Sequence, residues 1–123
     1  MTDLAPMHRI DPISLTDASD WSRYVYIVHE IGHTFCVKIG KCANPKTRLF
    51  ALQGGNPRRL RIYAAWNTTA VNALHVERAA QREFSDNRIG GEWFAIHAGV
   101  ASKYISQFEA PGKIPWECRG RYA

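Results

Sequence analysis

The sequence predicts an α+β domain, in which a small three-stranded antiparallel sheet is flanked by helices in the order β-β-α-β-α-α. Three segments, 24–28, 34–40 and 60–66, are rich in β-branched and aromatic residues, which is typical of strands. Two further segments, 45–53 and 70–86, follow helix-capping residues, and 97–108 also resembles a helix. With so few strands, we expect the helices to pack on the sheet.

The element boundaries follow from residues that begin or end regular structure. Gly32 lies between the first two strands and can adopt the positive φ of a hairpin turn. Asn44 caps the first helix and Pro45 is tolerated at its first position, and a Gly-Gly pair ends it. Thr68 or Thr69 caps the second helix.

The length of 123 residues predicts one domain. Residues 1–20 are interpreted as an N-terminal arm or capping segment, 21–109 as the folded domain and 110–123 as a C-terminal tail. The sequence contains no transmembrane run and no secretory signal, so we expect a cytoplasmic protein that does not bind membranes. Three cysteines without a C-x-x-C pair argue against a disulfide framework and a cysteine-based zinc site.

The net charge of +5 is concentrated in one part of the chain. No Asp or Glu occurs between Glu30 and Glu77, whereas this span holds Lys38, Lys41, Lys46, Arg48, Arg58, Arg59 and Arg61. Such a basic region attracts polyanions, and DNA or RNA fits better than a membrane because no basic amphipathic helix is present. The alternative is a solvated surface that happens to be basic.

Two charged residues fall on or beside the apolar faces of predicted helices. Glu77 lies in the apolar stripe of the second helix, so we expect it to be paired, hydrogen-bonded or bound to a metal, and Gln81 could orient it. Arg48 lies beside the stripe of the first helix, where a planar guanidinium suits a phosphate. The alternatives are a structural salt bridge for Glu77 and an arginine stem that covers apolar surface.

The hairpin carries two more candidates, Tyr26 and Lys38. A three-residue loop at 31–33 would place them directly opposite each other, and an ammonium group beside the phenol would favour the phenolate. The alternative is an ordinary cross-strand pair. His33 could contact phosphate, whereas a zinc site with His29 would need a helix in place of the turn.

Together these residues resemble the GIY-YIG nuclease superfamily. Its hallmark is a "GIY" triplet, ten or eleven residues, a "YIG" triplet, an arginine about eight residues later and a glutamate on a later helix. Here "YVY" ends at Tyr26, eleven residues follow, "KIG" ends at Gly40, Arg48 lies eight residues further on, and "VER" supplies Glu77.

The resemblance extends from residue 24 to about 96, because "GEWFAI" is similar to a phage- and plasmid-associated branch that uses "KIG" and "EWF". Tyr24 stands where the family has glycine, and Lys38 stands where it has tyrosine, as in some restriction-type relatives. Asn87 could correspond to an asparagine of the family's later helix.

The resemblance implies that 21–109 is a catalytic domain that hydrolyses phosphodiester bonds at one Mg²⁺ or Mn²⁺ ion. By this resemblance Glu77 holds the metal, Arg48 clamps the scissile phosphate, Tyr26 takes the proton from the attacking water, and Lys38 tunes Tyr26 or binds phosphate. The expected nucleic-acid contacts are Lys41, Lys46, Arg58, Arg59, Arg61 and His33.

The sequence therefore predicts a metal-dependent DNA endonuclease that nicks with low intrinsic sequence specificity. RNA stays open as a substrate, and so does a homodimer or a protein partner that supplies specificity. One alternative is a non-catalytic nucleic-acid-binding module, such as a phage regulator. Another is a protein-interaction module of the same fold.

Overall fold

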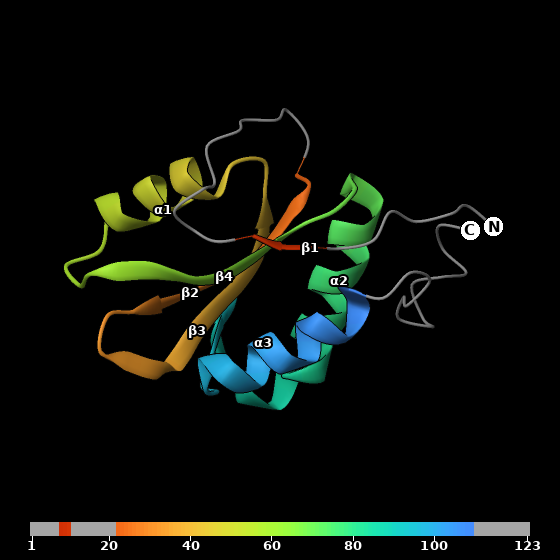
Figure 1. The fold of residues 1–123 in the computed structure, drawn as a ribbon. Helices are drawn as coiled ribbons and strands as arrows, with labels where there is room; N and C mark the ends of the chain where they lie inside the picture. The colour runs from red at the N-terminus through yellow and green to blue at the C-terminus, as the bar shows by residue number, and fades with distance from the viewer. Residues whose placement is uncertain (1–7, 11–21, 110–123) are drawn as a thin grey trace.

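The chain folds around one antiparallel sheet (Figure 1). The computed structural model describes residues 8–10 and 22–109. The described strands are β1 (His8–Ile10), β2 (Tyr24–Glu30), β3 (His33–Cys42), β4 (Leu60–Asn67), β5 (Arg88–Gly90) and β6 (Trp93–Phe94). The described helices are α1 (Pro45–Gly54), α2 (Ala70–Glu83) and α3 (Ala98–Ser106), with short 3-10 turns at Ser85–Asn87 and Gln107–Glu109.

The α+β class is confirmed, but the prediction of three strands is wrong. Within the described residues the sheet has six strands, in the order β1-β4-β2-β3-β6-β5. The three unpredicted strands are only two or three residues long, too short to show an alternating pattern. β1 and β6 pair with the longer strands β4 and β3, and β5 pairs with β6. β1 belongs to the predicted N-terminal arm, whose other residues, like the tail at 110–123, lie outside the described residues.

The predicted helix starts are confirmed. The Asn44 side chain accepts hydrogen bonds from the backbone N–H groups of Lys46 and Thr47, and Pro45 is the first residue of α1. Thr69 caps α2 by accepting the N–H of Asn72. These caps fix where α1 and α2 leave the sheet, and therefore which of their residues face it.

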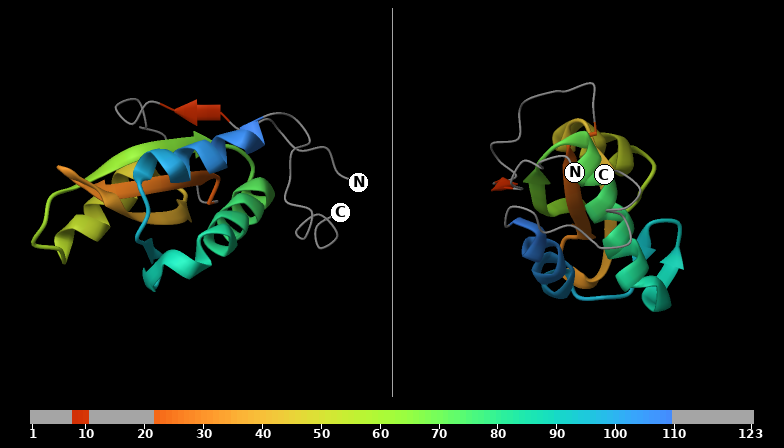
Figure 2. Two further views of the ribbon diagram at one scale, coloured as in Figure 1. Left: turned by 90° about the horizontal axis from the view of Figure 1, so that it is seen from below. Right: turned by 90° about the vertical axis from the view of Figure 1, so that its right-hand side faces the viewer.

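Helices cover both faces of the sheet, α1 on one and α2 with α3 on the other (Figure 2). Val25 and Ile27 of β2 point into the core beneath α2 and α3. Tyr26 and Val28, which alternate with these residues along β2, point into a smaller core beneath α1. Leu49 packs against this second core. Because both faces are covered, β2 is apolar along most of its length and does not alternate with exposed residues. No helix in the described ranges is long and apolar enough to cross a membrane.

The hairpin register differs from the one predicted. Tyr26 lies opposite Gly40, and Lys38 lies opposite Val28. The turn is short, with Gly32 at a φ of 83°, and the register shifts at the end of β2. Tyr26 and Lys38 therefore share a face of the sheet, but as diagonal neighbours rather than a direct pair.

Candidate functional site

Tyr26 forms the floor of the candidate site. It is 1% exposed, and its ring crosses over Gly40 on the neighbouring strand. A Cβ atom at position 40 would lie 2.6 Å from the Tyr26 hydroxyl and 2.8 Å from its Cζ. Real Cβ atoms essentially never show contacts under 3.0 Å, so only glycine leaves room for the tyrosine ring. The glycine of "KIG" is explained by this packing.

Arg48 of α1 reaches this tyrosine. Its Nε donates a hydrogen bond to the Tyr26 hydroxyl over 3.3 Å, while the residue as a whole is exposed. Burial raises the pKa of Tyr26 to about 12, and the guanidinium of Arg48 opposes that rise. The hydroxyl is therefore protonated at neutral pH, and Arg48 is the cation that favours its ionisation.

Lys38 is directed at a different partner. Its Nζ lies 3.1 Å from Oε1 of Glu92 and 5.8 Å from the centroid of the Trp93 ring. The residue is buried, because β3 is covered on this face. We expected Lys38 beside the Tyr26 hydroxyl, but the cation that contacts this hydroxyl is Arg48.

Glu77 approaches from α2, on the opposite side of the sheet, and meets the outer edge of β3. It is buried, and its carboxylate accepts the backbone N–H of Lys41. One turn later, Gln81 Nε2 donates to the carbonyl oxygen of Ile39 over 2.9 Å. Gln81 thus binds the strand instead of orienting Glu77. Together, Glu77 and Gln81 bind backbone N–H and C=O groups of β3 beyond the point where the short β6 ends.

Glu92 is the residue of the site that our sequence analysis missed. Its Oε1 would lie 3.1 Å from a Cβ at Gly40, the same point that the Tyr26 hydroxyl approaches. Burial first, and then the charge of Glu92, raises the pKa of Glu77. The only sequence signal was the acid within "GEWF", and the loop that carries it connects two strands too short to be predicted.

The carboxylate of Glu77 is a donor of the kind that a hard divalent cation binds, since Mg²⁺ and Mn²⁺ prefer carboxylate oxygens. One carboxylate suffices for Mg²⁺, which keeps several waters. Glu92 is paired with Lys38, and its charge, after burial, contributes to the raised pKa of Glu77. The described part of the chain contains no group of three or more His, Cys, Asp or Glu side chains that could hold a metal ion.

A basic pocket of about 570 Å³ adjoins Arg48. It is lined by Ser22, Lys41, Cys42, Ala43, Asn44, Thr47, Arg48 and Ala51, a set without a carboxylate. Lys46 is exposed in the first turn of α1 and lies between the pocket residues Asn44 and Thr47 in the sequence. Two of the predicted nucleic-acid contacts, Lys41 and Lys46, therefore lie on the elements that border the site.

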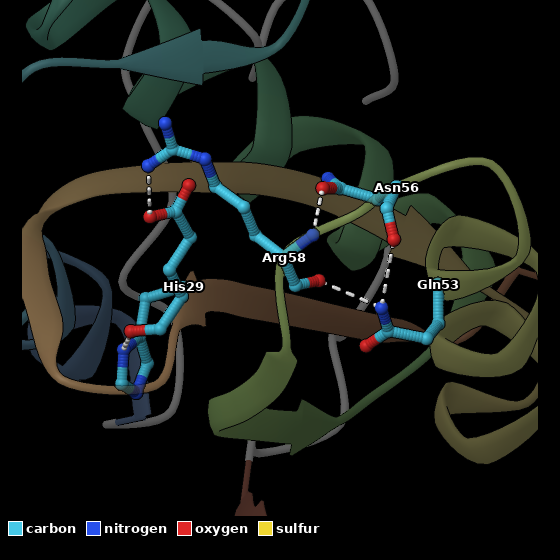
Figure 3. A network of polar contacts seen from close by, with 5 residues as sticks. His29, Gln53, Asn56 and Arg58 are labelled. Atoms are coloured by element: carbon cyan, nitrogen blue, oxygen red, sulfur yellow. Dashed lines mark hydrogen bonds and ion pairs between the residues drawn. The ribbon is translucent and has the colours of Figure 1, made fainter.

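The other predicted contacts lie at the opposite end of the sheet, where Arg58 forms a network with the β2 end and the α1–β4 loop (Figure 3). Its Nη1 lies 3.1 Å from Glu30 Oε1. The backbone carbonyl oxygen of Arg59 accepts a hydrogen bond from the N–H of Ile31 at the hairpin turn. Glu30 is four residues beyond Tyr26 in β2, about 13 Å along the strand.

The remaining two predicted contacts share this distal end. Arg61 is exposed and lies opposite His29, and His33 is exposed at the start of β3. His29 is buried, with Nδ1 2.6 Å from the carbonyl oxygen of Glu30. Asn87 is exposed in the 3-10 turn before β5. None of these four is joined to the Tyr26 cluster by a hydrogen bond or ion pair described in this structure.

Comparison with family models matches residues 23–109 to the T5orf172 domain. This is a phage-associated domain family related to the GIY-YIG nucleases. Neither the comparison with curated proteins nor that with solved structures found a match. The matched span contains every residue of the cluster around Tyr26 and covers more than half of the chain. The protein therefore belongs to the T5orf172 domain family.

Proposed function

We propose that this protein is a cytoplasmic, metal-dependent endonuclease that nicks DNA by hydrolysing phosphodiester bonds. The observation that carries the proposal is the contact between Arg48 and the buried Tyr26 hydroxyl, in a cluster that also contains Glu77 and Glu92. A cation, a phenol and carboxylates on separate elements form the set of groups that phosphodiester hydrolysis needs. Membership of a family related to nucleases supports this assignment.

The proposed roles follow from the positions of the side chains. Arg48 is exposed apart from its bond to Tyr26, so it can bind the scissile phosphate and orient the hydroxyl at the same time. Tyr26 accepts the proton of the attacking water, and the adjacent guanidinium stabilises the phenolate. Glu77 would hold Mg²⁺ or Mn²⁺, which would supply positive charge at the leaving oxygen.

We propose DNA as the substrate, and cleavage of RNA in the same assay would reassign it, since the basic surface attracts either polyanion. Lys41 and Lys46 extend the basic surface next to Arg48, whereas Arg58 and its neighbours form a second basic area at the hairpin end. We propose that both areas contact the phosphate backbone, which binds without sequence preference. A monomer with one site nicks, and double-strand cleavage would require a homodimer or a partner.

The first test is cleavage of supercoiled plasmid in Mg²⁺ or Mn²⁺ by the wild type and by Arg48→Ala. We expect nicking by the wild type and a loss of about 10²- to 10³-fold in the variant, because the phosphate loses its clamp. Lys103→Ala removes one positive charge from an exposed position of α3 and serves as the matched control. Equal cleavage by all three proteins would contradict the role of Arg48.

The competing function is a nucleic-acid-binding module that does not cut. It would be favoured if the wild type fails to nick in either metal ion yet retards the plasmid in a salt-sensitive way. The presence of a buried carboxylate next to the phosphate-binding cations favours the enzyme, because binding alone gains nothing from it.

The proton-transfer role of Tyr26 predicts a pH dependence. Because the pKa of Tyr26 is about 12, the phenolate fraction rises about tenfold per pH unit through the neutral range, so the cleavage rate should rise between pH 6 and about pH 9. Tyr26→Phe should lose about 10²-fold or more in rate and show a flatter profile. Single-turnover cleavage of a labelled duplex measures both. A wild-type rate that does not change with pH would rule out the phenolate as the base.

A further inference from the structure

Each carboxylate of the site lies near a cation. The charges of Lys41 and Arg78 act on Glu77, and Lys38 is paired with Glu92. A phosphate that approaches Lys38 therefore meets an ammonium group whose charge Glu92 offsets. The ion pair between Lys38 and Glu92 is the closest contact between opposite charges here, at 3.1 Å.

The two partners of this pair differ in how firmly they are held. The Lys38 side chain is 11% exposed, and its ammonium lies against the Trp93 ring, which packs on the core beneath α1. The Glu92 side chain is 35% exposed and comes from the loop between β5 and β6. Glu92 can therefore turn away into solvent, whereas Lys38 stays in place when the contact opens.

Resting on the proposed function, we propose that Glu92 is a positioning residue of the phosphate site. Its carboxylate holds the Lys38 ammonium in place and cancels its charge while the site is empty, and the substrate phosphate then replaces Glu92 as the partner of Lys38. This exchange gives Lys38 a function in the position where the wider superfamily has tyrosine.

Glu92→Gln tests this by measuring DNA binding without any metal. We expect the variant to bind a short duplex about three- to tenfold more tightly than the wild type in EDTA, measured by fluorescence anisotropy at constant salt. In Mg²⁺ its KM should fall while kcat also falls, because Lys38 is no longer held. A purely stabilising pair would leave the metal-free affinity unchanged.

Glu83→Gln is the matched control, because it removes one negative charge from an exposed position of α2. Equal metal-free affinities of Glu92→Gln and Glu83→Gln would overturn the proposal. If Glu92→Gln does not fold, Lys38→Gln provides the second test: it leaves Glu92 without its ammonium partner and should bind DNA more weakly than the wild type. Unchanged binding by Lys38→Gln would also overturn the proposal.

Failure of this inference can be told from failure of the proposed function. If the wild type binds DNA but never cleaves it, the proposal of an endonuclease fails. The affinities of the variants for DNA without metal still decide the role of Glu92. If the wild type cleaves DNA and the metal-free affinities of Glu92→Gln and Glu83→Gln do not differ, only the role of Glu92 is removed.

Discussion

Glu77→Gln is expected to reduce DNA cleavage by about 10³-fold or more and, at the same time, to raise the stability of the protein. Glutamine keeps an oxygen that can accept the N–H of Lys41, so the edge of β3 stays covered. Only the negative charge is lost, and with it the group that would hold the metal ion. The rate loss is measured with labelled duplex in Mg²⁺ and in Mn²⁺.

The gain in stability follows from the sign of the pKa shift. Burial, and then Glu92, raises the pKa of Glu77 above its ordinary value of 4.5, so the folded protein binds this proton more tightly than the unfolded chain. The contribution of this protonated carboxyl to folding stability is fully present below pH 4.5. It is lost as the pH rises through the folded-state pKa of Glu77. At neutral pH the buried carboxylate therefore costs stability, which the glutamine removes.

Thermal unfolding between pH 4 and pH 8 checks this. Glu77→Gln should melt above the wild type at pH 7, and the difference should shrink toward pH 4. Glu83→Gln, at an exposed position of the same helix, is the control and should melt close to the wild type. A Glu77→Gln protein that cleaves DNA at the wild-type rate would remove Glu77 from the site.

Gly40→Ala should damage both the site and the fold. Its methyl group would meet the hydroxyl and Cζ of Tyr26 at 2.6 and 2.8 Å, and the ring is buried and cannot move aside freely. We expect a loss of about 1–3 kcal/mol in the free energy of unfolding, together with a loss of cleavage that exceeds the loss of folded protein. Displacement of the tyrosine breaks its bond to Arg48.

The control for this prediction is Gly54→Ala at the end of α1. Apart from its chain neighbours and the backbone of its own helix, nothing lies within 4 Å of a Cβ at that position, so alanine should be neutral or stabilise the protein by about 0.5–1 kcal/mol. Urea unfolding and cleavage are measured on both variants. If Gly40→Ala matches Gly54→Ala in stability and activity, the close packing of Tyr26 on Gly40 is not a requirement of the site.

Local patterns in the sequence predicted the longer elements well. The long strands and the helix starts depend on neighbouring residues, such as the Asn44-Pro45 cap and the alternation in 60–66, and these act within a few residues along the chain. The short strands β1 and β6 escaped prediction because they pair with strands far away in the sequence, and β5 escaped because it pairs only with the two-residue β6. Their own residues carry too little pattern.

The sequence by itself determined the α+β class, the main hairpin, the helix caps and the spacing that brought Tyr26, Arg48 and Glu77 to attention. Only the tertiary structure decided the partners: Tyr26 packs on Gly40 and contacts Arg48, whereas Lys38 pairs with Glu92. The physical reason is that strand register and sheet order depend on the packing of the whole sheet between α1 and the pair α2 and α3. A contact across that sheet therefore leaves no pattern in any local segment.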